Sequence, residues 1–366
     1  MTDPRRELLH LEVWGDPEGR AIQPGPLVDA LASAVASGYP SGLAFAVVDR
    51  QGLLVAGYGG SACAIGDPVP IRRDTLFDLA SLTKVVATVP LALVMCQRAH
   101  WSLQDPVAAW VPGFPHPDTT LWHLLTHTSG LVPHRAFYLT CRGATAIRKA
   151  VFEEVRASRP GDDVCYSDLN FILLGWALER CAGVPLDALF RQEIAGPLGM
   201  ARTRFRPPPG VRRRTAATEL DGDQRTGPGL VWGTVHDGNA FALGGVAGHA
   251  GLFGPVDELA TFAGALLDPP SHPVLSEASI ADMSARQAGH PPDVRGLGWR
   301  LEPTEWGSWP NDTYWHTGFT GTSLLVSPSR GLGVVLLMNG VHPHRRPDEQ
   351  MAVRSRIHSI IAEVCQ

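Results

Sequence analysis

The chain has 366 residues, of which 44% are hydrophobic and 18% are charged, so it can bury a sizeable core and is unlike a disordered protein. Its formal net charge of −5 at pH 7, without a basic stripe that carries interleaved aromatic residues, argues against a nucleic-acid partner. The densest basic run, Arg212–Arg214, lies in a segment rich in Pro and Gly and is interpreted as a solvated loop.

Targeting signals and cysteine motifs are absent from the sequence. The first residues lack an apolar stretch followed by a small-residue cleavage site, and no apolar run is long enough to span a bilayer. The six cysteines are scattered without a C-x-x-C pair, which favours reduced, mostly buried thiols. We therefore expect a cytoplasmic protein with no membrane partner.

The two ends of the chain both carry strand patterns. Near the N-terminus, a helical pattern over residues 26–37 precedes strand-like runs at 42–48 and 53–58, with a hairpin turn between them. Near the C-terminus, four strand-like runs precede a helix over about 347–364. These four runs are 298–301, 313–316, 323–327 and 333–339.

The middle of the chain is mostly helical in pattern. The predicted helices cover 83–98, 104–110, 143–157, 168–182 and 185–194. A segment at 203–250 shows little periodicity, and long irregular segments inside compact enzymes are often functional. The order of the patterns predicts an α+β fold in which one central antiparallel sheet is built from both ends of the chain, flanked by the terminal helices, with a mostly helical lobe inserted.

The first candidate for chemistry is the S-x-x-K motif of Ser81 and Lys84. A lysine three residues after a serine on a helix shares its face and can reach its hydroxyl. A serine hydroxyl needs such a group to take its proton. The apolar neighbours of the pair predict burial, which would lower the pKa of the lysine and make it a usable base. The alternative is an N-cap serine followed by a surface lysine.

Two further motifs lie downstream. Tyr166-Ser167-Asp168 could supply a tyrosine held close to phenolate and an aspartate that bonds to Lys84, or simply a core tyrosine and a helix cap. His316-Thr317-Gly318 follows a strand-like run, and its glycine allows close approach to a strand edge. The alternative is a half-buried histidine at a strand end.

Together, S-x-x-K, Y-S-[ND] and [KH]-T-G occur in an order that resembles the serine β-lactamase-like and penicillin-binding-protein-like hydrolases, closest to the class C β-lactamase and D-peptidase/esterase branch. The resemblance covers about residues 25–362. Three further segments carry it: 121–131, 247–262 and 296–299. It implies one β-lactamase/transpeptidase-like domain with an α/β lobe of about 1–75 and 220–366 and a helical lobe of about 76–219.

The resemblance also implies roles. Ser81 would form an acyl-enzyme, Lys84 and Tyr166 would act as the general base and acid pair, and the N–H groups of Ser81 and Phe319 would form the oxyanion hole. Asp168, His316, Thr317 and Gly318 would contact the substrate. Two residues depart from true β-lactamases, because His316 replaces a lysine and Asp168 replaces an asparagine. These departures favour esters or amides over β-lactams.

Two other groups of histidines were considered. The segment 232–249 resembles a loop of relatives linked to muropeptide or peptide amide hydrolysis, so His236 and His249 are candidate substrate-binding residues. The alternative is a loop held by its own hydrogen bonds. His123 and His127 have the spacing of a zinc pair, but the glutamate of H-E-x-x-H is missing, so no metal is expected.

The leading hypothesis is a serine hydrolase that acts on a small ester, amide or peptide, with no cofactor, as a monomer or homodimer. An acyltransferase that passes the acyl group to an amine or alcohol is the first alternative. A non-catalytic acyl-binding sensor is the second.

Overall fold

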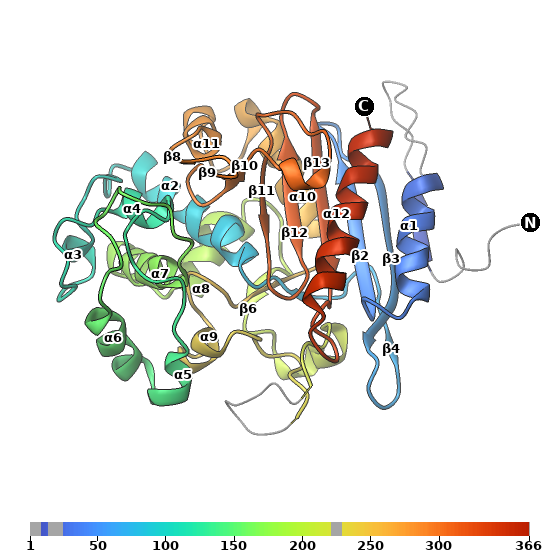
Figure 1. The fold of residues 1–366 in the computed structure, drawn as a ribbon, viewed down its shortest axis with the longest axis horizontal. Helices are drawn as coiled ribbons and strands as arrows, with labels where there is room; N and C mark the ends of the chain where they lie inside the picture. The colour runs from blue at the N-terminus through green and yellow to red at the C-terminus, as the bar shows by residue number, and fades with distance from the viewer. Residues whose placement is uncertain (1–8, 14–24, 221–228, 366) are drawn as a thin grey trace, which may run out of the picture.

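The computed structural model describes residues 9–13, 25–220 and 229–365 (Figure 1). Its main feature is a ten-stranded antiparallel sheet in the order β1-β3-β2-β13-β12-β11-β10-β9-β8, with β4 paired to β3. These strands are β1 (Leu9–Val13), β2 (Gly42–Val48), β3 (Leu53–Cys63), β4 (Val69–Pro70), β8 (Ala288–His290), β9 (Asp293–Arg295), β10 (Arg300–Leu301), β11 (Tyr314–Thr317), β12 (Ser323–Ser327) and β13 (Leu332–Met338). The pairing of β2 with β13 joins the two ends of the chain.

Both faces of the sheet are covered, which explains why β2 and β13 are apolar at every position. All seven residues of β2 and all seven of β13 are buried. Successive side chains point to opposite faces. Phe45 therefore packs with α1 (Gly25–Ala36) and α12 (Pro347–Val364), whereas Ala44 belongs to the core that contains α10 (Val256–Leu267). Figure 1 shows α1 and α12 side by side over one face, as predicted for the terminal helices.

The remaining helices form a group beside the sheet (Figure 1). They are α2 (Val89–Gln97), α3 (Val107–Trp110), α4 (Leu121–Leu125), α5 (Phe137–Thr140), α6 (Ala144–Glu153), α7 (Asp168–Ala182), α8 (Leu186–Phe190), α9 (Gly238–Ala242) and α11 (Glu277–Ser284). A small sheet of β5 (Phe77–Asp78), β7 (Leu252–Gly254) and β6 (Arg204–Phe205) connects this group to the main sheet. The predicted α+β architecture is confirmed. One buried apolar cluster runs through both parts, and the division into lobes near residues 75 and 220 stays a prediction.

Several elements differ from the sequence-based expectation. The helix expected over 83–98 begins with a π-helical turn, Lys84–Thr88, and only then becomes α2. The short strands β1, β8 and β9 were not expected, because each has few residues and no clear alternation. Within 203–250, the described residues form β6, α9 and the 3-10 turn Pro209–Arg214, while residues 221–228 lie outside the described part.

All six cysteines lie in the described part and are free thiols, but only Cys63 is buried and the other five are half-buried. Among the described residues, no single helix is long and apolar enough to cross a membrane. One bent pair, α7 with the segment Leu186–Ala195 at 76°, meets the criterion on length and composition alone.

Candidate active site

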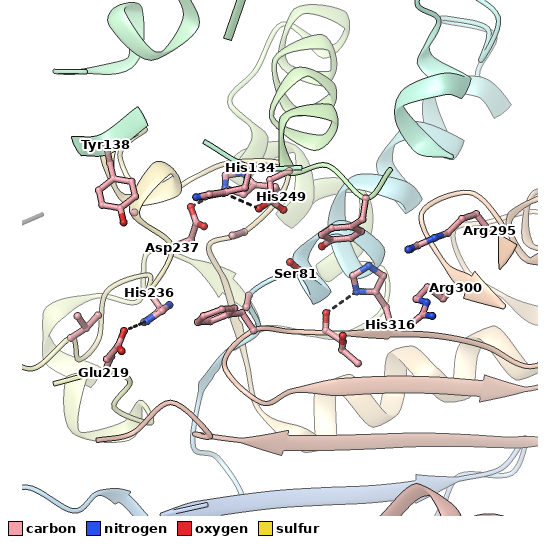
Figure 2. A pocket seen from close by; sticks show the side chains of 18 residues that line it. Ser81, His134, Tyr138, Glu219, His236, Asp237, His249, Arg295, Arg300 and His316 are labelled. Carbon is pink, nitrogen blue, oxygen red and sulfur yellow. Dashed lines mark hydrogen bonds and ion pairs between the residues drawn. The ribbon is translucent and has the colours of Figure 1, made fainter. Parts of the chain in front are cut away.

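A pocket of about 640 Å³ opens between the helical group and the end of β11 that lies beyond its pairing with β10. Ser81, Tyr166, Asp168 and His316 all line it (Figure 2). The three motifs, which are far apart in the sequence, therefore meet at one cavity.

Ser81 follows a tight, strained turn. Ala80 has φ of +47°, in the left-handed region that non-glycine residues seldom adopt. The turn is held because the buried Asp78 accepts a hydrogen bond from Ala80 N at 2.9 Å through Oδ1 and one from His236 N at 2.6 Å through Oδ2. A π-helical turn starts three residues later, and such turns often occur at functional sites. The local backbone thus places the Ser81 hydroxyl at the pocket.

Lys84 is completely buried, and its Nζ donates to three oxygens. These are Ser81 Oγ at 2.9 Å, Asp168 Oδ1 at 2.8 Å and the His249 carbonyl at 3.1 Å. Three acceptors match the three protons of an ammonium. Burial lowers the pKa of Lys84, but the Asp168 carboxylate outweighs it and the net pKa is raised. The expectation that burial would leave this lysine with a lowered pKa is therefore wrong.

Tyr166 is packed among cations and rings. Lys84 Nζ lies 5.0 Å from the Tyr166 ring centroid, the His127 ring lies at 4.6 Å and Arg295 Cζ lies at 5.6 Å. Burial raises the pKa of Tyr166, and the nearby Lys84 offsets this only in part. The residue is thus a neutral phenol, rather than the near-phenolate that the sequence suggested.

Asp168 begins α7 and contacts both Lys84 and His134, which lines the pocket. Its Oδ1 accepts from Lys84, and its Oδ2 lies 3.3 Å from Nδ1 of the half-exposed His134. Although burial alone would raise the pKa of Asp168, the Lys84 ammonium holds it well below its usual range. The carboxylate is therefore ionised and raises the pKa of His134.

The turn that follows β11 is hydrogen-bonded to the segment that precedes Ser81. Thr320 Oγ1 donates to the Asp78 carbonyl at 2.7 Å, and Thr322 Oγ1 donates to the Leu79 carbonyl at 3.1 Å. A side chain at Gly318 would place its Cβ 2.1 Å from Thr322 Oγ1, so only glycine fits there. This packing brings the backbone of Phe319 to the same pocket as Ser81.

The last helix braces the same turn from behind. Arg354 Nη2 donates to the carbonyls of Gly318 at 3.2 Å and Thr322 at 3.3 Å, and Gln350 Nε2 donates to the carbonyl of Phe319 at 3.2 Å. Burial lowers the pKa of Arg354 to about 10, so it stays charged at neutral pH. These contacts were not predicted from the sequence.

His316 does not act as a cation here. It is buried, its Nδ1 lies 2.9 Å from the Thr317 carbonyl, and burial followed by repulsion from Lys84 lowers its pKa well below the usual value. The neighbouring Thr317 lines the pocket. The replacement of a lysine by His316 therefore removes a positive charge from this position.

The loop histidines that the sequence singled out each pair with an acid at the pocket. His236 Nε2 lies 3.1 Å from Glu219 Oε2, and His249 Nε2 lies 2.9 Å from Asp237 Oδ1. Figure 2 shows both pairs on one side of Ser81. Sequence reasoning did not single out Glu219, which follows an irregular threonine-rich stretch and carries no motif.

Three further residues that line the pocket were also missed: His134, Arg295 and Arg300. His134 lies three residues after the T-H-T-S-G-L segment, and Arg295 directly precedes G-L-G-W. Both were therefore next to segments already noted. Proximity to such a segment is the signal that could have found them.

His123 and His127 do not converge on a common ligand. His123 Nδ1 accepts from Thr120 N at 3.0 Å in the cap of α4, while His127 Nδ1 accepts from Ser167 N at 3.0 Å beneath Tyr166. In the described part of the chain, no group of three or more His, Cys, Asp or Glu side chains is arranged to hold a metal ion.

Comparisons with known proteins identify the family of the chain. The beta-lactamase family pattern matches residues 28–356, so the chain belongs to the β-lactamase family. It is 31% identical over 356 residues to an N-acetylmuramyl-L-alanine amidase of Bacillus subtilis, which spans 86% of this chain and 80% of that protein.

Two further similarities concern a peptidase relative and a solved structure. A putative D-alanyl-D-alanine carboxypeptidase of Escherichia coli K12 is 30% identical over 359 residues, which spans 85% of this chain and 82% of the relative. The structure of EstCE1, described as a hydrolase with promiscuous acyltransferase activity, superimposes with a TM-score of 0.74 at 21% identity over 92% of this chain and 97% of EstCE1. At that identity, the match shows the shared fold alone.

Proposed function

We propose that the protein is a serine amidase that cleaves a small peptide-like amide through an acyl-Ser81 intermediate. The observation that carries the proposal is the contact of 2.9 Å between Lys84 Nζ and Ser81 Oγ, with Tyr166 beside both. The two named relatives, an amidase and a putative carboxypeptidase, both act on amide bonds according to their names.

The charge state of the site sets the first step. Lys84 is an ammonium and Tyr166 a neutral phenol, so the pair must lose one proton before it can accept the proton of Ser81. Ser81 Oγ then attacks the carbonyl carbon. The backbone N–H groups of Ser81 and Phe319 stabilise the oxyanion that forms.

Collapse of that intermediate breaks the C–N bond. The Lys84–Tyr166 pair returns the proton to the leaving amine, which departs with its part of the substrate. Water then attacks the acyl-serine and gives its proton to the same pair. The acyl C–Oγ bond breaks as the pair passes this proton to Ser81 Oγ, which releases the acid product and restores Ser81. Asp168, His316 and Thr317 support this chemistry as walls of the pocket, and Gly318 allows the turn after β11 to pack against the Leu79 carbonyl.

The test is covalent labelling. A fluorophosphonate should add its mass to the peptide that contains Ser81, and Ser81→Ala should abolish the labelling. Ser167→Ala is the control, because Ser167 is buried and donates to the Val132 carbonyl at 2.7 Å. Label that persists in Ser81→Ala would contradict the proposal.

A product assay separates hydrolysis from the alternatives. The product of an amide or p-nitrophenyl ester is analysed with and without an added amine. A free acid under both conditions supports hydrolysis, whereas a new amide supports acyl transfer. The intact set of Ser81, Lys84 and Tyr166 argues against the non-catalytic sensor, which would show no turnover.

A further inference from the structure

One end of the pocket is lined by two arginines. The Arg295 side chain is only 5% exposed, and its Nη1 has no hydrogen-bond partner among the described residues. Leaving a buried donor unpaired costs free energy. Arg300 lines the same end, and Figure 2 shows both side chains beyond His316.

The acids that pair with these arginines face elsewhere. Arg295 Nε lies 2.6 Å from Asp293 Oδ1, and Arg300 Nη1 lies 3.0 Å from Glu305 Oε1. Neither Asp293 nor Glu305 lines the pocket. Because His316 is neutral, the cationic character of this end comes from the guanidinium groups, which match a carboxylate.

The opposite end carries two carboxylates, Asp237 and Glu219, each of which is paired with a histidine. Asp237 and Glu219 are 22% and 27% exposed, and the pKa of Asp237 is lowered to about 2 because His249 outweighs its burial. His249 is 1% exposed and its Nδ1 has no partner in the described part of the chain.

Aromatic faces accompany these acceptors. Tyr138 and Phe319 line the same pocket, and the Phe319 ring stacks on His236 at 5.5 Å between centroids. Arg345 Cζ lies 4.2 Å from the centroid of the Phe319 ring, but Arg345 does not line the pocket. Carboxylates with aromatic faces suit an ammonium group.

Figure 2 places Ser81 between the two ends. We propose that the pocket selects a zwitterionic peptide, with its ammonium group at Asp237 and Glu219 and its carboxylate at Arg295 and Arg300. In a peptide, the acyl fragment keeps the amino end and the released amine keeps the carboxylate. The inference rests on the proposed function and names its substrate class.

The test uses the tripeptide L-Ala-D-Ala-D-Ala in four forms. Its N-terminus is free or acetylated, and its C-terminus is the free acid or the amide. Binding of each form to the Ser81→Ala protein is measured by calorimetry, which removes turnover. The free zwitterion should bind about tenfold more tightly than either singly capped form, a difference of about 1.4 kcal/mol.

Variants assign each charge to its end of the pocket. Glu219→Gln should remove the preference for the free N-terminus and keep that for the free acid. Arg300→Met should do the reverse, and Arg295→Met should do so more strongly. Since Arg295 is buried, its variant is checked by thermal melting, and Arg300→Met, at a side chain 28% exposed, provides the independent result.

Equal binding of all four forms, or no binding of any, would overturn the inference. Either outcome together with labelled Ser81 would leave the acyl-serine proposal standing. Loss of fluorophosphonate labelling would instead overturn the proposed function itself.

Discussion

At the scale of single residues, Asp168 stands where true β-lactamases have an asparagine, and this difference changes the charge state of Lys84. An asparagine there could still accept a hydrogen bond from Lys84, but it could not supply a charge. The carboxylate 2.8 Å from Nζ keeps the lysine protonated and so opposes its use as a base. The site therefore depends on deprotonation, either by pH or by substrate binding.

Asp168→Asn should shift the pH profile to lower pH. Without the carboxylate, burial dominates and the pKa of Lys84 falls, by about 1–3 units for loss of a close opposite charge. The ascending limb of kcat/KM against pH should move down correspondingly. His134→Gln is the control, since His134 contacts the same carboxylate and also titrates. If the limb moves only in His134→Gln, it belongs to that histidine.

At the scale of elements, the π-helical turn at Lys84–Thr88 shows what the sequence could and could not indicate. The apolar spacing predicts a helix at 83–98, but this pattern does not take account of Pro90. Pro90 lacks the N–H that an α-helix would direct to the Val86 carbonyl, and the turn instead closes by Val89 N bonding to the Lys84 carbonyl.

The sequence predicts one site that contains Ser81, Lys84, Tyr166 and His316. This prediction follows from the order of the motifs, because the family that they resemble implies a fold. Arg295 and Arg300 could not be placed in this way. They lie on β9 and β10, strands of three and two residues whose register depends on tertiary pairing rather than on local pattern.

The last helix, α12, should affect catalysis without touching the substrate. Arg354→Met removes the donor to the Gly318 and Thr322 carbonyls and should loosen the backbone that carries the Phe319 N–H. We expect kcat for a p-nitrophenyl ester to fall, by up to about 100-fold, with a smaller change in KM. Arg356→Met, on the exposed side of α12, is the control. A rise in KM alone would contradict a positioning role.

At the scale of the whole molecule, buried neutral histidines should make the fold sensitive to mild acid. Burial lowers the pKa of His358 to about 3 and that of His272 to about 4, and it also lowers the pKa values of His127 and His316. Because the folded pKa values lie below the unfolded value near 6.5, the unfolded chain binds protons first as the pH falls. The contribution of these histidines to the free energy of unfolding is thus complete above about pH 6.5 and decreases below it.

Urea unfolding between pH 7.5 and 5 measures this effect. Each such histidine should contribute about 1.4 kcal/mol per pH unit to the slope in this interval. His358→Gln should flatten the slope by one such step, whereas His100→Gln, at an exposed site, should not. A slope that is unchanged in His358→Gln would show that this histidine is protonated in the folded protein.

The complete burial of Lys84 also has a practical consequence. The sequence contains only one other lysine, Lys149, whose side chain on α6 is 77% exposed. Apart from the α-amino group of the chain, amine-reactive reagents therefore have a single accessible lysine, and α6 contributes no residue to the lining of the candidate active site. A fluorophore or a surface attached through Lys149 would leave the pocket open to substrate.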